Sequence, residues 1–161
     1  TYSDNFTRMC VLICPNSTKD TYADNSTMRC VDECPDMPDY YAEETSRRCV
    51  KLCLEATPTF AGTFANNISR RCVSTCPSEV DYYSDNSTRR CVKNCPKDPL
   101  TFADNSTRRC VLTCPDLPQD LYGDLKSGRC VLVCPEEELT YADNTTRRCE
   151  RVCNATALLF G

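Results

Sequence analysis

Sixteen cysteines carry most of the chemistry that this 161-residue sequence could perform. They form eight Cys-x-x-x-Cys pairs, whose first members lie 19 or 20 residues apart except for one step of 23. The pairs are Cys10/Cys14, Cys30/Cys34, Cys49/Cys53, Cys72/Cys76, Cys91/Cys95, Cys110/Cys114, Cys130/Cys134 and Cys149/Cys153. Thiols at this density can bind zinc, exchange electrons or form structural disulfides.

Composition separates these three chemistries. Zinc sites usually combine Cys-x-x-Cys with histidine or further cysteines, and the chain has no histidine. A redox motif would be a Cys-x-x-Cys present once or twice rather than eight times. An even cysteine count with a short period is typical of structural disulfides in secreted proteins. We therefore expect disulfides, with no metal and no cofactor.

The cysteines belong to a longer repeat. Aligned on the first cysteine, every copy has an aromatic residue eight positions earlier, and seven copies have arginine just before the cysteine. Valine follows the first cysteine in seven copies, and proline follows the second in six. The segment from Thr101 to Pro115 is close to the ideal unit. Repeats of this length indicate a modular array rather than one domain.

Each unit is predicted to be a β-hairpin. The Asp-Asn-Ser-Thr tract favours a turn, and the Arg-Arg-Cys-Val-x-x-Cys segment favours a strand that ends at proline. Reversal about Asn-Ser places the aromatic residue opposite the arginine before the cysteine, within reach of a cation–π contact or simple packing in a small core. The expected pairs are Tyr22–Arg29, Tyr41–Arg48, Phe64–Arg71, Tyr83–Arg90, Phe102–Arg109, Tyr122–Arg129 and Tyr141–Arg148.

Composition supports a small, disulfide-rich, mostly β fold without a single core. The chain has five phenylalanines and no tryptophan, so disulfides must replace much of the usual hydrophobic stabilisation. We expect one elongated rod of eight modules over residues 1–161. Their approximate bounds are 1–14, 15–34, 35–53, 54–76, 77–95, 96–114, 115–134 and 135–153, with 154–161 as a half-module that completes residues 1–10 of a next copy. The extra residues of the long step lie in 57–63 and predict a surface loop.

The spacing resembles a known family. The motif from Cys91 to Pro96, followed by a hairpin and the next Arg-Cys-Val, resembles the furin-like cysteine-rich repeats of growth-factor receptors. The tandem pattern also resembles cysteine-rich repeat surface glycoproteins of ciliates and other protists. The resemblance covers essentially the whole chain and implies an array of small β modules.

Spacing alone does not fix the cysteine connectivity. The receptor resemblance implies that the second cysteine of each unit bonds to the first cysteine of the next. The implied bridges are Cys14–Cys30, Cys34–Cys49, Cys53–Cys72, Cys76–Cys91, Cys95–Cys110, Cys114–Cys130 and Cys134–Cys149. The alternative joins like cysteines of neighbouring units, first to first and second to second, as in two-disulfide modules.

The implied scheme leaves Cys10 and Cys153 over. The last residues, read into the first residues of another copy, complete one more hairpin with a similar cysteine spacing. We therefore expect copies to join head to tail, with Cys153 of one bonded to Cys10 of the next. Heterologous contacts of this kind propagate filaments. The competing interpretation is an arbitrary segment of a longer repeat array.

Eight asparagines begin an Asn-x-Ser/Thr sequence, the acceptor motif for N-linked glycans. They are Asn5, Asn16, Asn25, Asn67, Asn86, Asn105, Asn144 and Asn154. Six of them occupy one repeat position, five residues before the first cysteine, whereas repeats three and seven carry Glu44 and Leu125 there. A good turn sequence explains the Asp-Asn pair, but the regular Ser/Thr favours glycosylation.

These features favour a structural role. The net charge of −4 gives no footprint for nucleic acid, and no apolar run suggests membrane insertion. Without histidine or a nucleophile motif, the chain offers no catalytic constellation, so we expect no enzyme activity. The prediction is a secreted or cell-surface structural glycoprotein, the unit of a glycan-coated filament or coat, with possible carbohydrate-mediated lateral contacts. The alternative is a cysteine-rich spacer or binding ectodomain of a receptor or adhesin.

Overall fold

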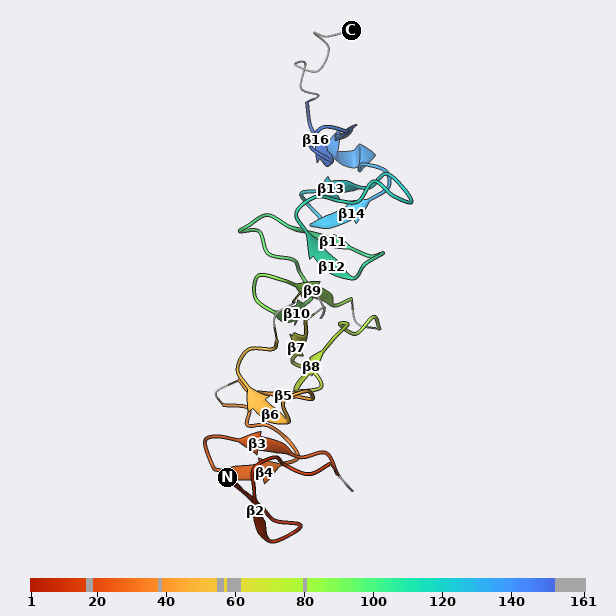
Figure 1. Cartoon of the computed structure of the whole chain (residues 1–161). Helices are drawn as coiled ribbons and strands as arrows, with labels where there is room; N and C mark the ends of the chain where they lie inside the picture. Colours follow the sequence, from red (N-terminus) through yellow and green to blue (C-terminus); the bar gives the residue numbers. More distant parts are fainter. Residues whose placement is uncertain (17–18, 38, 55–56, 58–61, 80, 153–161) are drawn as a thin grey trace. The chain divides into compact units, whose positions relative to one another are not determined.

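The computed structural model describes residues 1–16, 19–37, 39–54, 57, 62–79 and 81–152 (Figure 1). Each repeat contributes two three-residue strands, one that begins at the aromatic residue and one centred on the first cysteine. The strands are β1 (Tyr2–Asp4), β2 (Met9–Val11), β3 (Tyr22–Asp24), β4 (Arg29–Val31), β5 (Tyr41–Glu43), β6 (Arg48–Val50), β7 (Phe64–Asn66), β8 (Arg71–Val73), β9 (Tyr83–Asp85), β10 (Arg90–Val92), β11 (Phe102–Asp104), β12 (Arg109–Val111), β13 (Tyr122–Asp124), β14 (Arg129–Val131), β15 (Tyr141–Asp143) and β16 (Arg148–Glu150). A 3-10 turn, η1 (Glu136–Glu138), is the one helical element in these residues. The predicted disulfide-rich β-hairpin repeat is confirmed.

The hairpin register differs from the predicted one. In the sixth repeat, Phe102 lies opposite Val111 and Asp104 lies opposite Arg109, so the aromatic residue faces the valine after the cysteine. The predicted two-residue reversal was wrong, because the loop between β11 and β12 has four residues and shifts the pairing by two. The last loop residue, Arg108, adopts the left-handed conformation with φ of 57°.

This loop geometry recurs in every repeat. The residue before the second strand has φ between 53° and 67° in all eight copies. These residues are Arg8, Met28, Arg47, Arg70, Arg89, Arg108, Gly128 and Arg147. In the first, seventh and eighth repeats, the N–H group of this residue donates to the carbonyl oxygen of the aspartate that ends the first strand, as from Gly128 to Asp124 at 2.8 Å. The hairpin is therefore closed by a tight turn with a left-handed last residue.

Successive hairpins pair through parallel bridges. The middle residue of one repeat's first strand lies beside the arginine that opens the second strand of the next repeat, as Ala103 lies beside Arg129. Its N–H group donates to the carbonyl oxygen of the left-handed residue, from Ala103 to Gly128 at 2.8 Å. Strand pairing therefore joins repeats as well as the two halves of each repeat.

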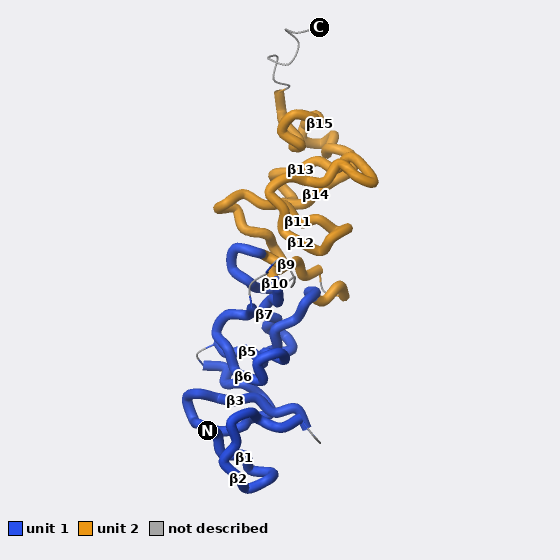
Figure 2. The backbone as a smooth tube through the Cα atoms, in the orientation of Figure 1, with its two compact units in different colours: residues 1–76, 86–91 blue, residues 77–85, 92–161 orange. Residues whose placement is uncertain are grey.

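The chain divides into two compact units (Figure 2). The first comprises residues 1–76 and 86–91, and its strand order is β10-β7-β8-β5-β6-β3-β4-β1-β2. The second comprises residues 77–85 and 92–161, and its strand order is β15-β16-β13-β14-β11-β12-β9. Within each unit the hairpins follow one another in sequence order.

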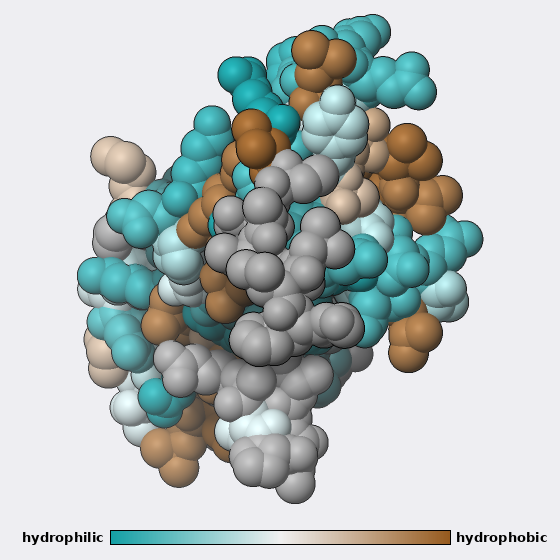
Figure 3. Space-filling view, turned by 90° about the horizontal axis from the view of Figure 1, so that it is seen from above, coloured by the Kyte–Doolittle hydropathy of each residue, from teal (hydrophilic) through white to brown (hydrophobic). Residues whose placement is uncertain are grey.

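Buried apolar residues form small separate clusters rather than one core. In one cluster, Tyr22 is fully buried against the disulfide partners Cys34 and Cys49 and against Ala42 of the next repeat. The same combination of ring, disulfide and small residue recurs around Tyr2 and Tyr83. The surface seen in Figure 3 shows hydrophobic side chains in small groups among hydrophilic ones. Each core therefore lies where two successive repeats meet.

Candidate functional site

The recurrent feature of the molecule is the junction between one repeat and the next. We define a junction as the aromatic residue of one repeat, the disulfide to the next repeat, and the next repeat's turn. Seven disulfides supply its covalent part. They join Cys14–Cys30, Cys34–Cys49, Cys53–Cys72, Cys76–Cys91, Cys95–Cys110, Cys114–Cys130 and Cys134–Cys149. These are the pairs that the receptor resemblance implies.

Each bridge closes a loop whose ends are 15 to 19 residues apart. In the chain-entropy model a loop of this length stabilises the folded state by about 3 kcal/mol. Cys10 is exposed and is the free cysteine of the described residues. Its predicted partner, Cys153, lies outside them, so the predicted bond between copies stays a prediction.

Arginine side chains cover five of the aromatic rings at short distance, but these are not the arginines that the sequence predicted. The shortest contacts come from the left-handed residue of the next repeat, which directly precedes the arginine before that repeat's first cysteine. The distances from guanidinium carbon to ring centroid are 4.7 Å for Arg47 over Tyr22, 4.8 Å for Arg70 over Tyr41, 4.4 Å for Arg89 over Phe64, 4.6 Å for Arg108 over Tyr83 and 4.7 Å for Arg147 over Tyr122. Cation–π contacts at this range contribute about 0.5–2 kcal/mol each.

The predicted contacts within one hairpin are therefore wrong. They were Tyr22–Arg29, Tyr41–Arg48, Phe64–Arg71, Tyr83–Arg90, Phe102–Arg109, Tyr122–Arg129 and Tyr141–Arg148. The four-residue loop moves these arginines opposite the residue that ends the first strand, as Arg109 lies opposite Asp104 and Arg71 opposite Asn66. Some of them instead reach a ring two repeats earlier, as Arg129 does over Tyr83 at 5.9 Å.

The left-handed arginine also anchors the loop that precedes the ring. Arg108 Nη2 donates to the carbonyl oxygens of Pro77 and Tyr82, at 3.3 Å and 2.8 Å. Its guanidinium lies 3.6 Å from the Asp81 carboxylate. A left-handed conformation costs a non-glycine residue about 1–2 kcal/mol. The hydrogen bonds and the ring contact offset this cost, which explains arginine at a position that backbone geometry alone assigns to glycine.

A second polar contact links the rings to the sequon position. Where the ring is tyrosine, its hydroxyl donates to the side chain five residues before the next repeat's first cysteine. The acceptors are Asn25 for Tyr2, Asn67 for Tyr41 and Asn105 for Tyr83, each at 2.5 Å, and Asn144 for Tyr122 at 2.6 Å. In the third repeat Glu44 takes the place of asparagine and accepts from Tyr22 at 2.8 Å. The position therefore supplies an acceptor to tyrosine.

The acidic residue at the end of the first strand organises the turn. Asp104 is fully buried, and its carboxylate accepts from the Ser106 N–H at 3.0 Å and from the Thr107 hydroxyl at 2.5 Å. Burial tends to raise the pKa of the Asp104 carboxyl, but the hydrogen bonds from Thr107 and Ser106 outweigh it and hold the pKa below its usual value. The Thr107 hydroxyl therefore caps a buried carboxylate.

This capping gives the sequon's Ser/Thr a structural role that sequence analysis missed. All eight copies carry Ser or Thr three residues before the first cysteine, including the two copies without a sequon. In those copies the backbone N–H groups of Ser46 and Ser127 donate to Glu43 at 3.2 Å and to Asp124 at 3.1 Å, and a side-chain hydrogen bond from Ser127 also helps to lower the pKa of Asp124. Ser46 and Ser127 could have revealed this structural role from the sequence, because they occur in the two repeats that have no acceptor asparagine.

The sequon asparagines of the described turns are all exposed: Asn5, Asn25, Asn67, Asn86, Asn105 and Asn144. When Oδ1 accepts from tyrosine, Nδ2, the atom that carries an N-linked glycan, is not used in that bond. Turn structure and glycosylation are therefore compatible at these positions. Asn16 is exposed as well, while Asn154 lies outside the described residues.

The junction between the sixth and seventh repeats is an apolar variant. Its ring, Phe102, has no hydroxyl, and Leu125 stands where other repeats carry an acceptor. Gly128 replaces the arginine, and a Cβ atom on Gly123 would lie 2.6 Å from the Phe102 ring. Phe102 and Gly123 fit together, because the ring occupies the space that the glycine leaves open.

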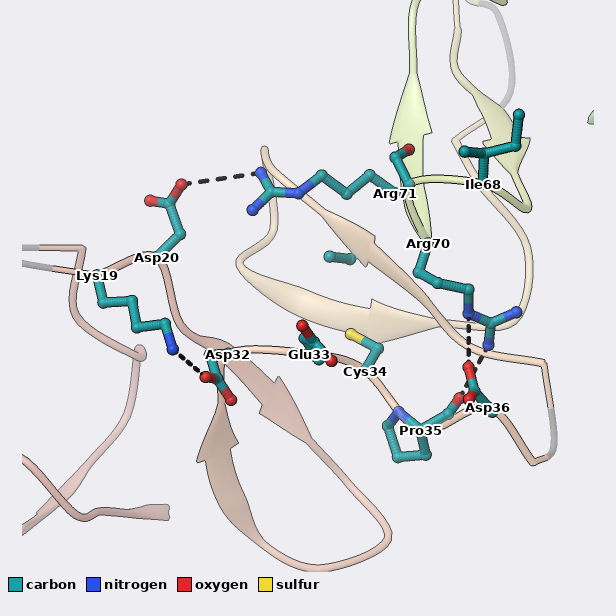
Figure 4. A pocket seen from close by; sticks show the side chains of 12 residues that line it. Lys19, Asp20, Asp32, Glu33, Cys34, Pro35, Asp36, Ile68, Arg70 and Arg71 are labelled. Carbon is teal, nitrogen blue, oxygen red and sulfur yellow. Dashed lines mark hydrogen bonds and ion pairs between the residues drawn. The ribbon is translucent and has the colours of Figure 1, made fainter.

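A polar groove in the first unit is lined by residues from the second to fourth repeats (Figure 4). Six of its charged side chains form three ion pairs: Lys19 with Asp32, Arg70 with Asp36 at 3.1 Å and Arg71 with Asp20 at 3.8 Å. Across the part of the chain that is described, no cluster of three or more His, Cys, Asp or Glu side chains could hold a metal ion. The groove offers paired charges rather than convergent catalytic groups.

The chain was compared with protein-family models, with curated proteins and with solved structures, and none of them matches. Within the described ranges, no helix is long and apolar enough to cross a membrane. The seven disulfides fit a protein that matures in an oxidising compartment.

Proposed function

We propose that this chain is an extracellular structural glycoprotein, the repeating unit of a glycan-coated filament or surface coat whose copies associate head to tail. The observation that carries the proposal is the recurrence of one junction. In seven successive repeats a ring is sealed by the next repeat and locked by a disulfide. Repeats that bury their surface only against neighbours can be extended one by one.

The glycan coat is supported by the exposure of the sequon asparagines at successive turns. Mass spectrometry of the secreted chain before and after N-glycosidase treatment tests it. We expect a mass loss of several glycans and conversion of asparagine to aspartate at the sequons. An unchanged mass would contradict the glycan coat but not the proposed head-to-tail association of the protein chains.

The covalent link between copies is the predicted Cys10–Cys153 disulfide. Glutathione disulfide supplies the oxidant: two thiols lose two protons and two electrons, and one glutathione disulfide becomes two glutathiones. Non-reducing electrophoresis should show a ladder of multiples of the 18.2 kDa chain, increased by any glycans. The Cys10→Ser variant keeps all seven internal bridges and should collapse the ladder to one band. A single band from the wild-type chain would contradict a disulfide-linked polymer.

The folded structure of the repeats should depend on disulfides rather than on a bound metal ion. We expect reductant to abolish its circular-dichroism signal and a chelator to leave that signal unchanged. A loss of structure with the chelator would contradict the disulfide-based account. The alternative, a spacer or binding ectodomain, predicts a chain that stays monomeric under oxidising conditions and binds a separate ligand.

A further inference from the structure

Four sequon asparagines are held by a tyrosine of the preceding repeat. Each accepts a hydrogen bond at Oδ1 from the ring hydroxyl, at 2.5 or 2.6 Å: Asn25, Asn67, Asn105 and Asn144. At Asn105 the donor is Tyr83, whose ring is fully buried although the asparagine itself is exposed. The amide oxygen is therefore engaged once the junction has closed.

The hydroxyl of the same sequon is engaged as well. An Asn-x-Ser/Thr acceptor is defined by the hydroxyl two residues after the asparagine. In the sixth repeat this hydroxyl belongs to Thr107, and it donates to the buried Asp104 carboxylate at 2.5 Å. The Ser106 N–H donates to the same carboxylate at 3.0 Å. The closed junction thus fixes the acceptor sequence in one conformation.

A bond to the amide oxygen works against glycan transfer to the amide nitrogen. The nitrogen of an amide is a weak nucleophile, because its lone pair is delocalised into the carbonyl group. A hydrogen bond accepted by the oxygen polarises the amide further in that direction. The amide group also cannot turn towards an enzyme without breaking the bond from Tyr83. Closure of the junction therefore lowers the reactivity of Asn105 Nδ2.

We propose that the tyrosine-bonded asparagines accept their glycans while their junctions are open, so that glycan transfer precedes closure of the disulfides. The co-reactant is an oligosaccharide carried on a lipid diphosphate. At Asn105 a bond forms between Nδ2 and C1 of the first sugar, the bond from C1 to the diphosphate oxygen breaks, and Nδ2 loses one proton as the lipid diphosphate leaves.

Oxidation of Cys95 and Cys110 then closes the junction around the modified side chain. Transfer at Nδ2 leaves Oδ1 in place, so the Tyr83 hydroxyl can still donate to it. This inference rests on the proposed glycan coat and adds to it the order of the two reactions. It also makes the tyrosine hydroxyl the group that decides which sites close to modification.

The chain contains its own comparison. Asn86 lies in the same Asp-Asn-Ser-Thr sequence as Asn105, but the ring of its junction is Phe64, which is buried and has no hydroxyl to donate. Closure of that junction cannot engage the asparagine oxygen through the ring. We therefore expect Asn86 to remain a glycan acceptor after its junction has closed, whereas Asn105 does not.

Glycan transfer in vitro to the unglycosylated full chain tests the proposal. The oxidised chain and the reduced, alkylated chain are each incubated with a purified oligosaccharyltransferase and its lipid-diphosphate donor. Mass spectrometry of peptides then gives the rate at each asparagine. We expect similar rates at Asn86 and Asn105 in the reduced chain. In the oxidised chain Asn105 should react about ten-fold more slowly than Asn86, because a hydrogen bond must break first.

Two reciprocal variants assign the effect to the hydroxyl. In the oxidised chain Tyr83→Phe should raise the rate at Asn105 about ten-fold, and Phe64→Tyr should lower the rate at Asn86 by a similar factor. Both variants keep a ring that other junctions already contain, so the fold is retained. Tyr82→Phe removes a hydroxyl from the residue next to Tyr83 and is the matched control, with no change expected at Asn105.

Equal rates at Asn86 and Asn105 in the oxidised wild-type chain would overturn the proposal. So would an unchanged Asn105 rate in Tyr83→Phe, or the absence of transfer to both sites of the oxidised chain, since the hydroxyl would then not be the deciding group. In each of these cases the glycan coat stands if the reduced chain is modified. If the reduced chain accepts no glycan at any sequon, the glycan coat fails together with this inference.

Discussion

The hydroxyl of Tyr22 donates a hydrogen bond to Glu44 of the next repeat, 2.8 Å away. Burial, followed by this hydrogen bond, raises the pKa of Tyr22 to about 12. Glutamate thus performs at this junction the task that asparagine performs at four others. The relationship shows that glutamate can accept from the ring hydroxyl as well as asparagine can.

The Tyr22 phenol should titrate late in alkaline solution. Because its pKa in the folded chain is raised above the usual value of about 10, its contribution to stability is full below pH 10 and is lost as the pH rises through about 12. Absorbance at 295 nm should show that one phenol fewer loses its proton above about pH 11.5 in Tyr22→Phe than in the wild-type chain. If that difference already appears near pH 10, the bond to Glu44 is not made in solution.

Asp104→Asn should destabilise the sixth hairpin at neutral pH by about 1–2 kcal/mol, because the variant loses a charge-assisted acceptor for Thr107. The folded pKa of Asp104 is lowered, so its stabilisation is present above about pH 4 and is lost as the pH falls through the folded pKa. Denaturant unfolding at pH 7 and pH 2 measures both effects. The exposed Asp116→Asn is the control, and equal losses for the two variants would contradict the capping role.

Arg108 and Arg109 are neighbours with different tasks, and they provide a matched pair. Arg108→Ala removes the contact with the Tyr83 ring and the bonds to two carbonyl oxygens, so we expect a loss of about 1–3 kcal/mol in unfolding free energy. Arg109→Ala at an exposed position should cost less than about 0.5 kcal/mol. The reverse order would favour the hairpin register that was predicted from the sequence.

The apolar junction should reject a side chain on Gly123. A Cβ atom there would meet the Phe102 ring at 2.6 Å, so Gly123→Ala should destabilise the second unit by about 1–3 kcal/mol. Gly128→Ala meets no atom within 4 Å, and its cost of about 1 kcal/mol should come from its left-handed backbone alone. Adding Phe102→Leu should restore stability to the Gly123→Ala variant but not to the Gly128→Ala variant. Relief of both would show that ring contact is not the cause.

Several features could be predicted from the sequence because they depend on spacing. The period of the cysteines defines the repeats, and the second strands are centred on the first cysteine, although each ends at the residue after it rather than at the proline that was predicted to end it. The hairpin register could not be read in the same way. It depends on a left-handed arginine such as Arg108, a residue type that rarely adopts this conformation. Gly128 at the aligned position was the visible signal for it.

The ring contacts between repeats were also hidden, because each aromatic residue was compared only with the arginine of its own repeat. The partners Tyr83 and Asn105 lie 22 positions apart and belong to different repeats. The same separation applies to Tyr122 and Asn144. A comparison of each ring with the next repeat's turn would have paired Phe102 with Leu125, where hydroxyl and acceptor are absent together.

Electron microscopy of the oxidised, secreted wild-type chain is the most direct test of the proposed head-to-tail assembly. The account predicts filaments that grow by addition of whole chains and that disperse in reductant. Separate particles of single-chain mass, unchanged by concentration or by oxidation, would contradict it.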